Sequence, residues 1–179
     1  MDVIEALRTR RSTKNYSTRA VSPQTLLELV DIARFSPSGA NKNPWRFIII
    51  TRRNTLDRLS ETQPHCRWLA SAPAGIALVV DPKNTRYWLE DCSVAAYSIW
   101  LAAIGKGLGV AWAAVHQSDD AEESERRQKF VREVLSVPDG LSIPMILAIG
   151  YPQASPPERK VSTLEEVVRR ESYSESGDS

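Results

Sequence analysis

The chain has 179 residues and a formal net charge of +1, from 23 basic and 22 acidic side chains. A charge so close to balance argues against a uniformly basic nucleic-acid-binding protein. Hydrophobic residues make up 42% of the sequence, which is typical of a globular domain, and no apolar run is long enough to span a bilayer. We therefore expect one folded domain that binds neither nucleic acid nor membrane. Residues 1–5 lack the features of a signal peptide, which favours a cytoplasmic location.

Apolar periodicity and turn residues predict alternating helices and strands. In chain order, we expect a helix from residue 3 that ends in the basic cluster 8–11, a helix from 23 to before 36, a strand over 47–50, a helical stretch over 56–69 broken near Pro64, a strand over 75–80, a long apolar helix over about 88–103, a strand over 110–115, a charged helix that runs to about 135, a strand over 144–149, and a short helical stretch over 164–170.

Several polar residues are expected to cap these helices. Asp2 with Glu5 resembles a capping box, and Ser22 precedes a proline that suits the first helical turn. Asn84 is expected to cap the long helix, and residues 118–120 the charged one.

Four uniformly apolar strands among helices predict an α/β or α+β sandwich, and the pattern leaves the strand order open. Residues 153–179 are polar and contain prolines. They cannot build a core of their own, so they are either disordered or lie on another surface, such as a partner subunit. We therefore expect a single domain over residues 1–170 that includes a C-terminal arm, followed by a polar tail over residues 171–179.

The glycine-rich segment 105–109 invites comparison with a dinucleotide-binding motif. Such a motif needs a strand before its glycines and a helix after them. Here a helix is expected before the glycines and a strand after them. A glycine cap at the end of the long helix is the better interpretation.

Three other segments contain groups that suit an anionic or planar ligand. Residues 10–14 carry three cations and two hydroxyls, which suit a phosphate, although cations at the end of a helix are often only solvated. Residues 36–45 combine small and amide side chains with a glycine that permits close approach of a ligand. Residues 151–160 end in Arg159 and Lys160, which could add charge to an anion site.

The two cysteines and two histidines could in principle bind a metal: Cys66, Cys92, His65 and His116. Their spacing matches none of the patterns typical of zinc sites. We therefore predict no metal site and interpret the two thiols as buried or idle.

Taken together and in order, four segments resemble the nitroreductase family of flavin enzymes. Residues 10–16 (RRSTKNY) resemble the opening motif of the family, and residues 33–47 (ARFSPSGANKNPWRF) resemble its second and most specific motif. Residues 107–112 (GLGVAW) and 149–152 (IGYP) match later landmarks. The resemblance covers residues 1 to about 168.

The resemblance implies an α+β fold, a nitroreductase-like sandwich with a central, mainly antiparallel sheet flanked by helices. It also implies a homodimer with exchanged C-terminal arms and two FMN sites at the interface. By matching motifs, the phosphate and ribityl end of FMN would be held by Arg10, Arg11, Ser12 and Lys14, with Arg159 and Lys160 completing the cationic cluster. The flavin would be approached by Pro37, Ser38, Gly39 and Asn41, expected from the partner chain. Residues Ala114, Val115 and His116 would pass near the isoalloxazine ring.

The activity implied by this resemblance is an FMN-dependent oxidoreductase. NADH or NADPH would reduce the flavin and leave, and a nitroaromatic, a quinone or a similar small conjugated acceptor would follow in a ping-pong scheme. This scheme requires no acid–base residue, so none is predicted as catalytic. Two alternatives stay open: a different flavin reaction on the same fold, such as dehydrogenation, dehalogenation or flavin transformation, and a non-enzymatic flavin-binding module.

Overall fold

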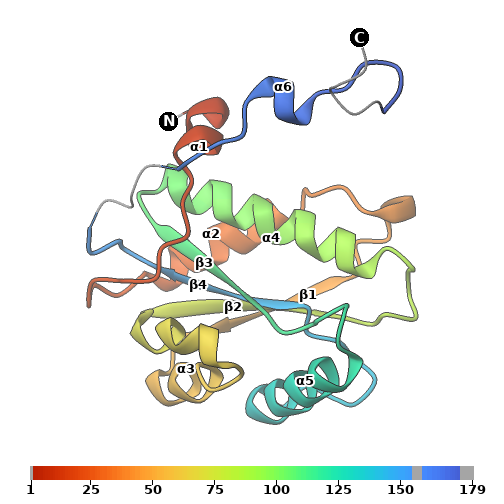
Figure 1. Ribbon diagram of the computed structural model, residues 1–179. Helices are drawn as coiled ribbons and strands as arrows, with labels where there is room; N and C mark the ends of the chain where they lie inside the picture. Colours follow the sequence, from red (N-terminus) through yellow and green to blue (C-terminus); the bar gives the residue numbers. More distant parts are fainter. Residues whose placement is uncertain (1, 155–158, 174–179) are drawn as a thin grey trace.

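The computed structural model describes residues 2–154 and 159–173 and forms a layered α+β fold (Figure 1). Its elements in chain order are α1 (Val3–Thr9), α2 (Pro23–Ala33), η1 (Gly39–Asn41), β1 (Trp45–Ile50), α3 (Arg53–Leu59), η2 (Pro64–Ser71), β2 (Ala74–Val80), α4 (Trp88–Gly105), β3 (Gly109–Ala114), α5 (Ala121–Leu135), β4 (Met145–Gly150) and α6 (Leu164–Val167), where η marks a 3-10 helix.

The four strands form one antiparallel sheet in the order β1-β2-β4-β3. The predicted antiparallel α+β class is therefore confirmed. Strands that are adjacent in the sheet come from distant parts of the sequence: Ala77 of β2 is opposite both Ile48 of β1 and Ile146 of β4. Because β1 and β3 lie at the edges, each has one neighbouring strand.

Helices cover both faces of the sheet, as Figure 1 shows, with α2 and α4 above it and α3, η2 and α5 below. Alternate residues of β2 point to opposite faces: Ile76 and Leu78 pack with α2 and α4, whereas Ala77 and Val79 pack with the lower helices. Strands buried on both sides need apolar residues at every position. This explains the uninterrupted apolar runs of β2 and β4, in which every residue is buried.

The structure corrects two local expectations. β1 is not uniformly buried in this chain, since Phe47, Ile48 and Ile49 are only half-buried at the sheet edge. Asn84 does not cap α4, which begins after Tyr87 without a side-chain cap. Instead, the Thr85 hydroxyl accepts a hydrogen bond from the Tyr87 amide at 3.1 Å.

The other predicted caps are confirmed. The side chains of Asp2, Ser22 and Asp120 accept hydrogen bonds from the first turns of α1, α2 and α5. At the end of α4, Gly107 has a left-handed backbone with φ of 73°. Its amide bonds to Ile104 and the Leu108 amide bonds to Ala103, which is the Schellman arrangement that a C-terminal glycine permits.

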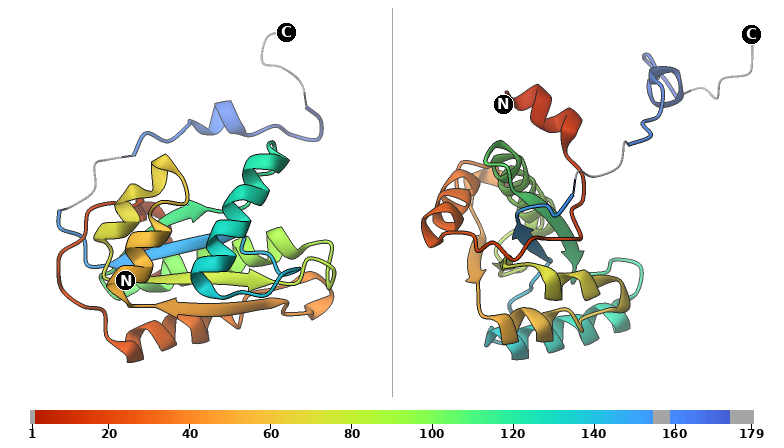
Figure 2. Two further views of the ribbon diagram at one scale, coloured as in Figure 1. Left: turned by 90° about the horizontal axis from the view of Figure 1, so that it is seen from below. Right: turned by 90° about the vertical axis from the view of Figure 1, so that its left-hand side faces the viewer.

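The segment from residue 159 to 173, which carries α6, extends away from the packed layers of the body (Figure 2). Its apolar side chains are exposed, with Leu164 at 73% and Val167 at 62%. None of the helices in the described residues has the length and apolar character that crossing a membrane requires.

Candidate functional site

The basic segment over residues 10–14 is fixed to edge strand β3 by its backbone. Ser12 forms a parallel bridge with Val110, and the Thr13 amide donates to the Val110 carbonyl at 2.9 Å. Thr13 is buried and lies directly over Gly109, where an added Cβ would be 2.3 Å from the Thr13 hydroxyl oxygen. Gly109, the first residue of β3, therefore allows the basic segment to pack closely against the strand.

The residues after the basic segment are held by the end of β4. The Ser17 amide donates to Tyr151 at 2.9 Å, and the Gln153 amide donates to Asn15 at 3.1 Å. The buried Tyr16 hydroxyl reaches the Ala148 carbonyl at 3.2 Å, and burial raises the pKa of Tyr16. Backbone bonds to β3 and to the chain after β4 thus fix the segment at both ends.

The side chains of the basic segment play different parts. The Arg10 guanidinium lies over the Trp100 ring at 4.6 Å. Arg11 donates to the carbonyls of Arg8 at 2.9 Å and Arg10 at 2.8 Å, so it covers acceptors at the end of α1. Ser12 and Lys14 are exposed. The segment therefore presents a hydroxyl and an ammonium group beside two positioned guanidinium groups, a donor set that fits a phosphate.

Lys14 extends toward the lower helical layer. Burial raises the pKa of the Cys66 thiol in η2, and the charges of Arg127 and Lys14 partly oppose that shift. Gln63 lies in the same region, where its side-chain amide donates to the Cys66 sulfur at 3.1 Å and to the Ala114 carbonyl at 3.0 Å. Gln63 thereby connects the lower layer to the end of β3.

The segment Ala114-Val115-His116 lies at the other end of β3. The amides of Val115 and His116 both donate to the Pro144 carbonyl, at 2.9 and 3.0 Å. At about 3.3 Å per residue, β3 separates Val110 from this segment by roughly 15 Å. An elongated ligand could therefore contact the basic segment and residues 114–116 at once.

His116 is held on two sides. Its ring makes an edge contact with Trp88, with centroids 4.9 Å apart, and its Nδ1 lies 3.2 Å from the Ser124 hydroxyl. Burial lowers the pKa of His116 below its usual value of 6.5, which favours the neutral form of the imidazole. The ring forms one wall of an open cleft of about 630 Å³, whose other walls come from α5 and the turn over residues 139–142.

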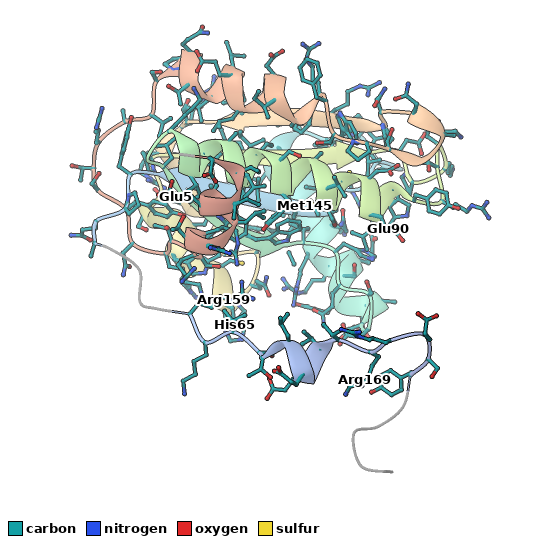
Figure 3. The ribbon with its side chains drawn as sticks, turned by 90° about the horizontal axis from the view of Figure 1, so that it is seen from above. Glu5, His65, Glu90, Met145, Arg159 and Arg169 are labelled. Atoms are coloured by element: carbon teal, nitrogen blue, oxygen red, sulfur yellow. The ribbon has the colours of Figure 1, made fainter. Side chains whose placement is uncertain are left out.

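The loop over residues 37–41 lies at the N-terminal end of α4. The Gly39 amide donates to the buried Asp91 carboxylate at 2.9 Å, and Tyr87 packs against Gly39 so closely that a Cβ there would be 2.5 Å from the ring. Figure 3 shows Glu90, the neighbour of Asp91, and Glu5 of α1 toward opposite ends of the molecule. Within one chain, the loop contacts α4 at Asp91 and the basic segment contacts it at Trp100, nine positions further along, which is roughly 14 Å at 1.5 Å per residue.

Arg159 and Lys160 are exposed on the segment that leads to α6. Figure 3 shows Arg159 outside the packed layers of the body. The preceding residues 155–158, part of the proline-containing segment singled out in the sequence, lie outside the described residues, as does the tail over residues 174–179. Within one chain, β3 thus connects the basic segment to residues 114–116. The other predicted site residues lie on different surfaces.

Three residues in these contacts were missed from the sequence: Thr13, Gln63 and Asp91. Thr13 lies inside the basic motif but was not distinguished from its neighbours. Gln63 carries no sequence signal, because its contact with Ala114 spans 51 positions. Asp91 did carry a sequence signal, because a carboxylate within a helix that is apolar almost all round is unusual and requires an explanation.

A basic segment fixed to one edge of an antiparallel sheet between two helical layers places this protein in the class of nitroreductase-like α+β folds. The model of the Nitroreductase family matches residues 7–67 and 60–151. The chain belongs to the nitroreductase family, whose members are oxidoreductases.

Two similar proteins support this assignment over nearly the whole chain. A relative from Methanothermobacter thermautotrophicus, which carries the provisional name NADH dehydrogenase/NAD(P)H nitroreductase, is 33% identical over 162 residues, covering 89% of this chain and 82% of its own. The structure of an FMN-dependent nitroreductase from Clostridium difficile has a TM-score of 0.86 and 29% identity, covering 95% of this chain and 99% of that one.

More distant relatives carry the names of other reactions. An iodotyrosine deiodinase from Thermotoga neapolitana is 26% identical, with 92% of this chain and 95% of its own covered. A 5,6-dimethylbenzimidazole synthase from Rhodospirillum rubrum is 24% identical, with 87% and 84% covered. Relatives of similar overall length thus bear names for different chemistries.

Proposed function

We propose that this protein is an FMN-dependent oxidoreductase that uses NADH or NADPH to reduce small conjugated acceptors, such as nitroaromatics and quinones, in a ping-pong scheme. One observation carries the proposal: the basic segment is hydrogen-bonded to one end of β3, and residues 114–116 lie at the other end of the same strand. Family membership and the similarity to an FMN-dependent nitroreductase support the choice of cofactor.

The donor groups along β3 fit FMN. Its phosphate carries close to two negative charges, and the end of α1 is the wrong end of a helix dipole for an anion. Side-chain cations must therefore provide the attraction, and Arg10, Arg11 and Lys14 supply three, with the Ser12 hydroxyl as a further donor. Bound FMN would supply the redox chemistry, while the protein binds and orients it.

The remaining predicted site residues belong to a homodimer in this proposal. Pro37, Ser38, Gly39 and Asn41 would come from the partner chain, as the resemblance to the family implies. Within one chain, this loop and the basic segment contact α4 at positions nine residues apart, Asp91 and Trp100. Arg159 and Lys160 would add charge from the arm. The exposed apolar side chains of the arm support a second chain as its binding surface.

The first test is a visible absorption spectrum of the purified protein, recorded before and after anaerobic addition of NADH or NADPH. We expect a flavin spectrum that bleaches on addition and recovers with a nitroaromatic or quinone. If the protein neither carries flavin nor acquires it from added FMN, the proposal is wrong.

A second candidate is another flavin reaction on this fold, which the names of the deiodinase and synthase relatives favour. A bound flavin that neither NADH nor NADPH reduces at an appreciable rate would support this candidate. Tight FMN binding without turnover of any acceptor would instead support a non-enzymatic flavin-binding module.

A further inference from the structure

Asp91 is a carboxylate buried in the first turn of α4, with only 5% of its surface exposed. It lies among apolar neighbours on the same helix, including Cys92 and Ala95. Removing an ionised carboxylate from water is costly unless nearby groups compensate for the lost hydration. The position therefore needs an explanation that packing alone does not give.

Two features of the local structure compensate for the charge in part. The Gly39 amide donates to Asp91 Oδ1 at 2.9 Å, and a helix N-terminus favours negative charge. The second oxygen, Oδ2, is buried and has no hydrogen-bond partner among the described residues. The carboxylate is thus only half satisfied, which is an arrangement that stability alone would not favour.

The loop bonded to Asp91 has an unusual backbone. Ala40, Asn41 and Asn43 have φ angles of 51°, 53° and 46°, in the left-handed region that residues with a side chain adopt at a cost. Such a conformation persists only when surrounding contacts hold it. The bond from Gly39 to Asp91 fastens the middle of the loop over residues 37–41 to α4, 52 positions further along the chain.

We propose that Asp91 is a positioning residue that holds the loop over residues 37–41 in the conformation that contacts FMN. The proposal rests on the function proposed above, because that function places this loop at the flavin. Asp91 acts through Gly39 and does not itself touch the cofactor. The oxygen of Asp91 that lacks a hydrogen bond costs free energy, and this cost accompanies the anchoring of a strained loop to α4.

Three substitutions test this role by different chemistry. Asp91→Ala removes the charge and the acceptor. Asp91→Leu also removes both but fills the space with an apolar side chain. Asp91→Asn retains an oxygen that can accept from Gly39. The matched control is Asp57→Ala, which removes an exposed carboxylate paired with Arg53 on α3, in the opposite helical layer.

The measurement is the dissociation constant of FMN from each apoprotein, obtained from the quenching of flavin fluorescence. We expect affinity to fall about tenfold in Asp91→Ala and Asp91→Leu, as for the loss of one hydrogen bond to a charged group. Asp91→Asn should restore most of the affinity, and Asp57→Ala should bind as the wild type does.

Thermal unfolding of the same apoproteins separates positioning from a purely structural role. Replacing a half-satisfied buried carboxylate with leucine should leave the unfolding temperature unchanged or raise it, although FMN binds more weakly. If Asp91→Leu loses stability and affinity together, or if all three variants bind FMN as the wild type does, the role assigned to Asp91 is wrong. Failure of the wild type itself to bind FMN would instead refute the proposed function.

Discussion

At the scale of single residues, the candidate site depends on close contacts that only glycine permits. Gly109 and Gly105 both belong to the segment 105–109, yet their surroundings differ completely. An added Cβ at Gly109 would meet Thr13 at 2.3 to 2.7 Å, whereas at Gly105 it would meet nothing within 4 Å. The two glycines therefore form a matched pair for testing how the basic segment is held.

We predict that Gly109→Ala weakens FMN binding and Gly105→Ala does not. The new methyl group at Gly109 must push Thr13 away from β3 and displace Ser12 and Lys14 with it. Overpacking of this kind costs about 1–3 kcal/mol, and we expect FMN affinity to fall by about two- to twelvefold if half of that cost appears in binding. At Gly105, alanine stabilises a helix by up to about 1 kcal/mol.

Fluorescence titration with FMN and chemical denaturation of both variants measure these effects. Equal FMN affinity in Gly109→Ala and Gly105→Ala would show that close packing of Thr13 on β3 does not position the basic segment.

At the scale of elements, α5 is joined to the sheet layer by a buried polar contact. Gln128 is 4% exposed. Its side-chain amide donates to the Ile143 carbonyl at 3.0 Å and its oxygen accepts from the Ile143 amide at 2.8 Å. The glutamine thus satisfies both backbone groups of Ile143, two positions before β4, as a neighbouring strand would. The same side chain lines the cleft beside His116.

We predict that Gln128→Leu destabilises the protein by about 2–6 kcal/mol, because two buried backbone groups lose their partners at about 1–3 kcal/mol each. Urea denaturation gives this value. The control is Gln24→Leu, an exposed position on α2, where we expect a change within about 0.5 kcal/mol. Indistinguishable stabilities of the two variants would mean that water replaces Gln128 at Ile143 without cost.

At the scale of the whole molecule, the sequence predicted elements better than it predicted their arrangement. Caps at Asp2, Ser22 and Asp120 were predictable because they depend on residues three positions apart. Strand order was not, because pairing depends on contacts between distant segments. The partial burial of β1 could not be predicted for the same reason. Its apolar run resembles that of β2, and the two strands differ only in that β1 lies at the edge of the sheet.

The candidate site shows the same division between local and distant information. Sequence motifs indicated the basic segment and the loop over residues 37–41 as separate segments. Their anchors, Gly109 for Thr13 and Asp91 for Gly39, become visible only in three dimensions. Whether the two segments meet in one FMN site depends on a second chain, which makes the oligomeric state the decisive property at this scale.

We predict that the protein is a dimer and that charge on the arm disrupts it. Leu164 and Val167 are three positions apart on α6, so they share one face of the helix. Because both are largely exposed in the single chain, replacing them with aspartate should cost the isolated chain little stability. In a dimer that buries them, the same change leaves two carboxylates without water, so we expect the variant to dissociate to the mass of one chain, 20.0 kDa.

Light scattering on the FMN-loaded protein, over a range of concentrations, measures this dissociation. Glu165→Gln is the control because it changes a charge on the same helix without adding one to the apolar face. Under the shared-site proposal, FMN should be lost as the Leu164→Asp/Val167→Asp chains separate, since each site would lose the partner's loop. A wild-type monomer that keeps its flavin would instead show that one chain is sufficient, and the loop over residues 37–41 would then lie outside the site.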